Sequence, residues 1–211
     1  MRTLLVDTAG PVVGLAAFVE GEPVYSASAR VTAGTEVWLE EHLSAALGAV
    51  GALQRVAVTV GPGTFTGIRV GVAAALGIAF ARGVEVVPLS SLALRACLAP
   101  GEPWVLALLD ARKGRVYAGW FDTRGPTPVA LGPEQDVSIE VAGNMPPGVA
   151  VGEGAAVFAD VVVALGHRLH ARASESPVGC GASLFCSVEA RSPETVGLRY
   201  LREPDAQPRK V

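Results

Sequence analysis

The residues best suited to chemistry form a glycine-rich stretch, Gly61-Pro62-Gly63-Thr64-Phe65-Thr66-Gly67, which follows an apolar run at 55–60. Because glycine adopts backbone angles closed to other residues, this composition predicts a tight loop after a buried strand. Thr66 is placed to cap a helix that runs on to Phe80. A strand, a glycine loop and a helix N-terminus can together cradle phosphate. The stretch lacks the spacing of a Walker A loop or a dinucleotide fingerprint, so a plain strand-to-helix turn is the alternative.

Two acidic residues, Asp7 and Asp110, each end an apolar strand. When the two segments are aligned on these aspartates, Phe18 and Phe121 also align, because each phenylalanine follows its aspartate by eleven residues. Both strands are followed by two further predicted strands. This weak internal repeat predicts two related subdomains that face each other across a cleft.

The order of predicted elements supports that division. We predict strands at 3–6, 12–19, 23–30, 55–60, 84–89, 104–109, 116–121, 128–131 and 149–152, and helices at 35–50, 67–80, 91–97, 155–165 and 182–190. Thr35 is the expected N-cap of the first helix. The prolines at 100–103 mark the expected boundary between an N-terminal subdomain, 1–100, and a C-terminal subdomain, 101–211, which ends in a loose tail at 203–211.

Composition narrows the classes of function. The chain has 211 residues, of which 50% are hydrophobic and 18% charged, so it can bury a sizeable core. A net charge of −3 without a dense basic run argues against strong unaided binding of nucleic acid. Cys97, Cys180 and Cys186 show no metal or disulfide spacing, which fits a reducing cytoplasm. No apolar run reaches the roughly 18–20 residues that cross a bilayer, so we expect no membrane association.

Residues 61–69 closely resemble the signature loop of the TsaB (YeaZ) family. Supporting matches are Leu5-Val6-Asp7-Thr8-Ala9, Val87-Pro88-Leu89-Ser90-Ser91-Leu92, Asp110-Ala111-Arg112-Lys113-Gly114-Arg115-Val116-Tyr117 and Tyr200-Leu201-Arg202. The similarity is clear over residues 1–122 and weaker beyond. The resemblance implies an α/β fold of the duplicated actin-like ATPase (ribonuclease-H-like) type, found in actin, sugar kinases and Hsp70. Each of its two subdomains would hold a mixed β-sheet flanked by helices, in agreement with the repeat.

The resemblance also implies a role in placing threonylcarbamoyl on a tRNA adenosine beside the anticodon. On this basis we expect a non-catalytic scaffold that pairs with a TsaD-like catalytic subunit and joins a TsaE-like ATPase. It would form a homodimer when alone and meet tRNA only through the complex. The expected contact residues lie on the first two helices and are Trp38, Glu41, His42, Gly71, Ala74 and Ala75. The small side of the second helix could equally pack on the protein's own sheet.

In the catalytic relative a pair of histidines binds a metal, and by the resemblance these positions fall at Ser91 and Arg95. A neutral serine is a poor ligand and an arginine cannot be deprotonated to become one, so we expect no metal and no catalytic residue. No cofactor is expected to be required. ATP or ADP could bind, mainly in the assembled complex, and the candidate residues are Asp7, Gly61, Gly63, Thr64, Thr66, Gly67 and Asp110.

Two alternatives stay open at this point. In nucleotide-using proteins of the fold, acidic residues that end the first strand of each half face the cleft and its metal. Asp7 and Asp110 could instead each cap a turn by accepting backbone N–H groups. The rival function is a small nucleotide-binding enzyme of the same fold, an ATPase or a kinase.

Overall fold

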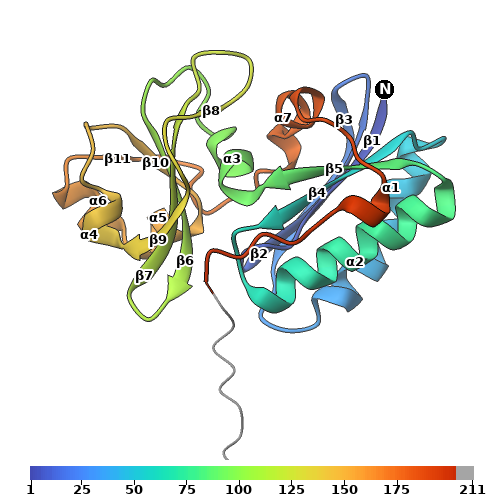
Figure 1. The fold of residues 1–211 in the computed structure, drawn as a ribbon, viewed down its shortest axis with the longest axis horizontal. Helices are drawn as coiled ribbons and strands as arrows, with labels where there is room; N and C mark the ends of the chain where they lie inside the picture. The colour runs from blue at the N-terminus through green and yellow to red at the C-terminus, as the bar shows by residue number, and fades with distance from the viewer. Residues whose placement is uncertain (203–211) are drawn as a thin grey trace, which may run out of the picture.

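The computed structural model describes residues 1–202, which form two β-sheets with helices packed against them (Figure 1). The tail predicted at 203–211 lies outside the described residues. The first half comprises β1 (Arg2–Asp7), β2 (Val12–Val19), β3 (Glu22–Arg30), α1 (Thr35–Val50), β4 (Arg55–Gly61), α2 (Phe65–Arg82), β5 (Glu85–Ser90) and α3 (Ser91–Ala96). The second half comprises β6 (Val105–Arg112), β7 (Arg115–Asp122), β8 (Val129–Ala130), β9 (Gln135–Ser138), α4 (Ile139–Ala142), β10 (Val149–Val151), α5 (Glu153–Val157), α6 (Ala159–Ala164), β11 (Arg168–Leu169) and α7 (Ala182–Ser187).

The two sheets have the same topology, which confirms the internal repeat. The first sheet has the order β3-β2-β1-β4-β5, and the second has the order β11-β10-β6-β7-β8, with β9 pairing to β7. In the first sheet β1 runs antiparallel to β2 and parallel to β4. In the second sheet β6 runs antiparallel to β7 and parallel to β10. Strand β6 therefore takes the place of β1, and Asp110 takes the place of Asp7.

Helices α1 and α2 lie side by side on the first sheet, over β2 and β4 (Figure 1). In α2 the buried positions Ile68, Val72, Ala75 and Ala79 recur every three or four residues, so one face of the helix packs on the strands. Within the described residues α2 also has the length and apolarity of a membrane span, which we had not expected. Core helices share this property, and α2 has such a core-facing side.

Helix starts differ from the prediction at two positions. Helix α1 begins at Thr35, and its N-cap is Gly34 in the left-handed conformation, with φ 76°. Helix α2 begins at Phe65 after Thr64, so Thr66 lies within the first turn and does not cap it. The third helix has a side-chain cap, because the Ser90 hydroxyl accepts hydrogen bonds from two backbone N–H groups of its first turn, at 3.2 and 3.1 Å.

The second half is less regular than predicted. The helix expected at 155–165 is broken into α5 and α6 at Phe158, and strand β9 was not predicted. After residue 177 the chain returns to the first sheet, where the Phe185 ring packs edge-on against Phe18 with centroids 5.0 Å apart. The division into subdomains at residue 100 stays a prediction.

Candidate functional site

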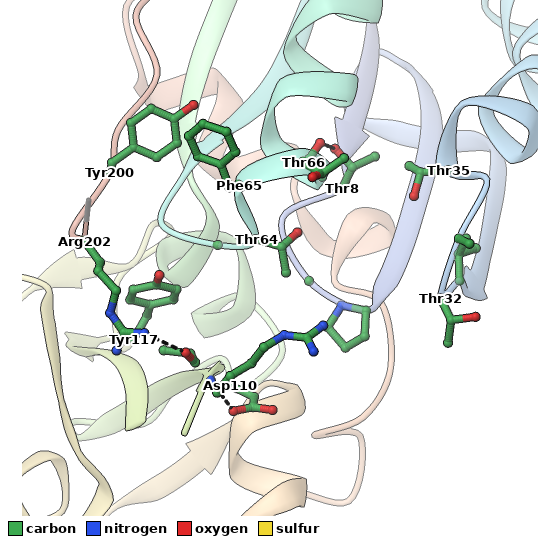
Figure 2. Close-up of a pocket in the computed structure, with 18 of the residues that line it drawn as sticks. Thr8, Thr32, Thr35, Thr64, Phe65, Thr66, Asp110, Tyr117, Tyr200 and Arg202 are labelled. Atoms are coloured by element: carbon green, nitrogen blue, oxygen red, sulfur yellow. Dashed lines mark hydrogen bonds between the residues drawn. The ribbon is translucent and has the colours of Figure 1, made fainter. Parts of the chain in front are cut away.

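A groove of about 770 Å³ lies between the two halves, and we call it the central groove. It is bordered by the loop after β1, the loop before α1, the first turn of α2, the β6–β7 hairpin and residues 200–202. Its labelled side chains are rich in hydroxyl groups, as Figure 2 shows. They are Thr8, Thr32, Thr35, Thr64, Thr66, Tyr117 and Tyr200, together with Phe65, Asp110 and Arg202.

The structure brings together most of the predicted nucleotide-binding residues. Those that line the central groove are Gly63, Thr64, Thr66, Gly67 and Asp110. Gly61 does not line it, because the backbone of Arg199 covers this glycine. Asp7 does not line it either, since its side chain is fully buried. The groove therefore gathers the loop residues and the second aspartate but not Asp7 or Gly61, and nucleotide binding itself stays a prediction.

Asp7 belongs to a buried ionic network centred on Arg95, and both side chains are inaccessible to solvent. The Arg95 guanidinium donates to the Asp7 carboxylate at 3.2 Å and to both carboxylate oxygens of Glu153 at 2.6 and 2.8 Å. Asp7 also accepts from the Thr59 hydroxyl at 2.7 Å and from the backbone N–H of Ala9 at 3.2 Å. Burial alone would lower the pKa of Arg95, but the charges of Asp7 and Glu153 raise it above its usual value.

The residues at this point do not fit a metal ion. Arg95 occupies the space between the two carboxylates, and its guanidinium supplies the positive charge that they require. Ser91 is fully buried, and its hydroxyl has no hydrogen-bond partner in the described part of the chain. Within residues 1–202 no group of three or more His, Cys, Asp and Glu side chains is arranged to hold a metal.

Asp110 has the turn-capping geometry that was the alternative for both aspartates. Its carboxylate accepts the backbone N–H of Arg112 at 2.7 Å. This bond supports a tight hairpin in which Arg112 and Lys113 have positive φ angles of 64° and 54°. Asp110 thus faces the groove while one of its oxygens holds the hairpin.

The glycine loop lets α2 begin very close to the loop after β1. A Cβ atom at Gly63 would lie 2.3 Å from the carbonyl oxygen of Ala9, and one at Gly67 would lie 2.2 Å from that of Thr8. Both distances are shorter than real contacts, so only glycine fits. The Thr8 hydroxyl in turn donates to the Gly67 carbonyl at 2.7 Å. The strand-to-helix turn, which was the alternative to a phosphate cradle, accounts for these glycines.

A second hollow of about 670 Å³ lies on the outer surface between α1 and α2, and we call it the α1–α2 groove. Its lining is largely apolar: Leu39, Leu43 and Leu47 from α1, and Val70, Ala73 and Ala74 from α2, with Glu36, Glu40 and Ser44 at the α1 side. Exposed apolar patches of this kind commonly mark binding surfaces.

Only part of the predicted interface lies at this groove. Ala74 lines it, whereas Gly71 and Ala75 are buried against the chain's own interior. The reason at Gly71 is steric, because a Cβ there would lie 2.1 Å from the Thr8 hydroxyl. Glu41 is exposed but does not line the groove. The small-residue side of α2 is therefore a core face at Gly71 and Ala75, which corrects the prediction.

Trp38 and His42 lie on the flank of α1 that meets β3. The Tyr25 hydroxyl of β3 and the Nδ1 atom of His42 are 2.9 Å apart, and the Trp38 and His42 rings are in contact with centroids 4.6 Å apart and planes inclined by 47°. His42 is therefore half-buried, and its ring is held by contacts within the chain. The groove residues that sequence reasoning missed are Leu39, Leu43, Leu47, Val70 and Ala73. The four-residue spacing of the three leucines, which places them on one face of α1, is the signal that could have found them.

Residues 199–202, which we call the C-terminal strap, join the two halves at the mouth of the central groove (Figures 1 and 2). On the first half, the Tyr200 ring packs on Phe65 with centroids 5.2 Å apart, and its hydroxyl accepts from Arg69 at 3.0 Å. On the second half, the Arg202 guanidinium donates to both carboxylate oxygens of Asp136, at 2.6 and 3.1 Å.

Comparisons with known proteins agree with the resemblance seen in the sequence motifs. The sequence model described as "TsaD: tRNA N6-adenosine threonylcarbamoyltransferase" matches residues 27–163. The Bacillus subtilis "tRNA threonylcarbamoyladenosine biosynthesis protein TsaB" is 31% identical over 41% of this chain and 38% of its own length. An uncharacterized Mycobacterium leprae protein is 32% identical, over 97% of this chain and 56% of its own length. A Mycobacterium tuberculosis protein is 30% identical, over 99% of this chain and 95% of its own.

Solved structures agree in fold. YeaZ from Pseudomonas aeruginosa superposes with a TM-score of 0.77 at 23% identity, covering 95% of this chain and 99% of that one. A second structure, titled as an uncharacterized protein similar to peptidase YeaZ, gives 0.79 over the same shares of the two chains. Two matching sheets with a groove between them define a duplicated actin-like protein. Within that class, the chain belongs to the TsaB/YeaZ family.

Proposed function

We propose that this chain is a non-catalytic partner subunit in the biosynthesis of threonylcarbamoyladenosine on tRNA. Its working surface is the α1–α2 groove, which holds a TsaD-type transferase. The observation that carries the proposal is that an open groove on the outside of the fold is lined by apolar side chains, of which Leu43, Leu47 and Val70 are only half-buried by the chain's own packing. The name of the Bacillus subtilis relative supports the pathway, and the TsaD-type sequence model supports a link to that transferase.

The buried network supports the non-catalytic part of the proposal. A nucleotide-using enzyme of this fold would need an acidic group from the end of β1 to face the groove and a metal. Here Arg95, Thr59 and Ala9 engage the carboxylate of Asp7, which lies away from the groove. We infer that the subunit requires no metal or nucleotide of its own. ATP or ADP would bind in the central groove only within the assembled complex, near Gly63 and Thr64.

The α1–α2 groove also bears on the other proposed partners, which are a second copy of this chain, a TsaE-like ATPase and tRNA. When the transferase is absent, two copies of this chain can cover the apolar groove by pairing with each other, which is the proposed homodimer. A TsaE-like ATPase and tRNA would then be met only through the assembled complex. The net charge of −3 agrees with this, because it gives the isolated chain little attraction for a nucleic-acid backbone.

The test uses the TsaD-type protein of the same organism. Ala73→Arg places bulk and charge on the groove lining, and Ala171→Arg makes the same change at an exposed residue of the second half, outside both grooves. We expect Ala73→Arg to abolish co-purification and Ala171→Arg to leave it unchanged, while both variants melt as the wild type does. Equal co-purification of the two folded variants would place the interface elsewhere. Rapid ATP hydrolysis by the isolated chain would favour the enzyme instead.

A further inference from the structure

The α1–α2 groove is apolar along its floor but acidic at one end. Glu36 and Glu40, one helical turn apart on α1, both line the groove and are exposed. Among the hydrogen bonds and ion pairs of residues 1–202, none involves the side chain of Glu36 or Glu40. Basic groups on the same two helices are few, since α1 has no lysine or arginine and α2 has only Arg69 and Arg82.

Of these two glutamates, only Glu36 stabilises α1 through the helix dipole. Glu36 lies in the first turn, where the helix dipole favours a negative charge. Glu40 lies one turn further on, beyond the reach of that effect. Arg69 cannot neutralise it easily, because its guanidinium lies 3.7 Å from the centre of the Phe65 ring and donates to Tyr200. Arg82 is at the opposite end of α2.

We propose that the groove selects a partner helix that is apolar at its centre and carries lysine or arginine opposite Glu36 and Glu40. This inference rests on the proposed function and adds the chemistry of the partner. Ala73 and Ala74 contribute only small side chains to the lining, so apolar side chains of a partner helix can approach α2 closely there. The unpaired carboxylates at the end then favour a cationic partner, because complementary charge at a rim sets specificity and association rate.

A second copy of this chain is a poorer occupant. In an antiparallel pairing of the two α1 helices, the glutamates of one copy face the end of α1 that holds Ser44, Gly48 and Ala49, which are uncharged. In a parallel pairing the glutamates face each other. Only Arg82 of the other copy could compensate, so self-pairing leaves excess negative charge. Like-charge repulsion should therefore make the homodimer weaker than the complex with a cationic partner helix, so that the partner displaces the second copy.

The experiment compares two changes of equal charge on the same helix. Glu40→Lys alters a residue that lines the groove, whereas Glu41→Lys alters its exposed neighbour, which does not. Affinity for the TsaD-type subunit is measured by titration calorimetry at about 50 and 500 mM salt, which changes the Debye length from roughly 14 to 4 Å. We expect Glu40→Lys to raise Kd at least tenfold and Glu41→Lys to raise it less than about threefold. Higher salt should weaken binding by the wild type and should not weaken binding by Glu36→Gln/Glu40→Gln.

The outcomes separate the two proposals. If the wild type binds but both lysine variants bind equally well, or salt has no effect, the charge inference is overturned and the groove is still an interface. If the folded wild type does not bind at all, the proposed function and the inference both fail. Light scattering on the isolated chain gives an independent result, since self-association should strengthen with salt and with Glu36→Gln/Glu40→Gln. Self-association that is indifferent to both changes would contradict the inference.

Discussion

The guanidinium of Arg95, on α3, lies 3.2 Å from the carboxylate of Asp7 at the end of β1, and neither side chain reaches solvent. On its other side Arg95 binds Glu153, the first residue of α5 in the second half. One arginine therefore links the strand ends of the first sheet to the second. By the resemblance, the position of Arg95 corresponds to a metal-binding histidine of the catalytic relative. In this chain the position carries an arginine, whose positive charge is fixed.

The first prediction is that Arg95→Met destabilises the fold strongly. The substitution leaves Asp7 and Glu153 as buried carboxylates without a counter-ion, and removing one partner from a buried pair costs about 3–5 kcal/mol. Urea unfolding of the variant measures this loss. Arg124→Met is the control, because the Arg124–Asp122 pair is at the surface and its loss should change stability little.

The triple variant Arg95→Met/Asp7→Asn/Glu153→Gln tests the cause. It removes the two buried charges together with their partner, so it should recover a substantial part of the stability lost in Arg95→Met. If the triple variant is no more stable than the single one, packing around Arg95 and not charge pairing dominates.

A second prediction concerns the start of α2. Gly67→Ala should destabilise the protein by about 1–3 kcal/mol, since the added Cβ would overlap the Thr8 carbonyl oxygen and force the backbone apart. Gly77→Ala is the matched control on the same helix, where nothing lies within 4 Å of the new methyl group. It should stabilise the protein by about 0.5–1 kcal/mol through helix propensity. Thermal melting of both variants checks the difference in sign, and destabilisation by both would contradict it.

The glycine loop also shows how far sequence reasoning reached. Local composition was enough to predict a strand, a turn and a helix at 55–82, because each depends on residues adjacent in the chain. The repeat around Asp7 and Asp110 predicted the paired sheets, because the same order of strands follows each aspartate in the sequence. It could not show which aspartate faces the groove. That difference depends on Arg95 and Glu153, which are 58 residues apart and meet only in the folded chain.

The α1–α2 groove could be predicted only in outline for a similar reason. A helix with small residues at several positions has more than one small face. Ala74 and Ala75 are neighbours in sequence, yet one lines the outer groove and the other is buried. Only the position of α2 on the first sheet decides between them. The role of the half-buried Leu43 and Leu47 of α1 was ambiguous for the same reason, because spacing of three and four residues describes a core face and a groove lining equally well.

The third prediction is that the free energy of unfolding depends on pH through Glu134. Burial raises the pKa of Glu134 above its usual 4.5, against the opposing effects of Ser90 and Arg199. The native state therefore holds this proton more tightly than the unfolded chain does, and its contribution to stability is lost as the pH rises through the raised pKa. Glu134→Gln should remove this loss. Urea unfolding between pH 4 and 7, compared for wild type and variant, checks it, and identical slopes would show that Glu134 does not contribute.

A fourth prediction is that Cys97 and Cys186 differ in their reactivity toward an alkylating reagent. Burial, with a smaller effect of Cys180, raises the pKa of Cys97 to about 12, so its thiol stays protonated at neutral pH. Cys186 is exposed. Iodoacetamide at pH 8 should therefore modify Cys186 in the native protein and leave Cys97 unmodified, as read by mass spectrometry of peptides. In urea both should react. Rapid native labelling of Cys97 would mean that this thiol is not enclosed.

The last prediction is that Arg202 holds the C-terminal strap against the second half. Its guanidinium donates to Asp136 and also, at 3.1 Å, to the Ala111 carbonyl, and its side chain is 23% exposed. Arg202→Ala should cost about 1–2 kcal/mol of stability, because these charge-assisted bonds are largely shielded from water. The strap should also open more often, so the Arg199 N–H, which donates to the Val60 carbonyl at 2.8 Å, should exchange faster with deuterated solvent. Arg168→Ala breaks a more exposed pair with Glu102 and serves as the control. Unchanged exchange at Arg199 in the Arg202 variant would show that Tyr200 and the first half hold the strap without help from Asp136.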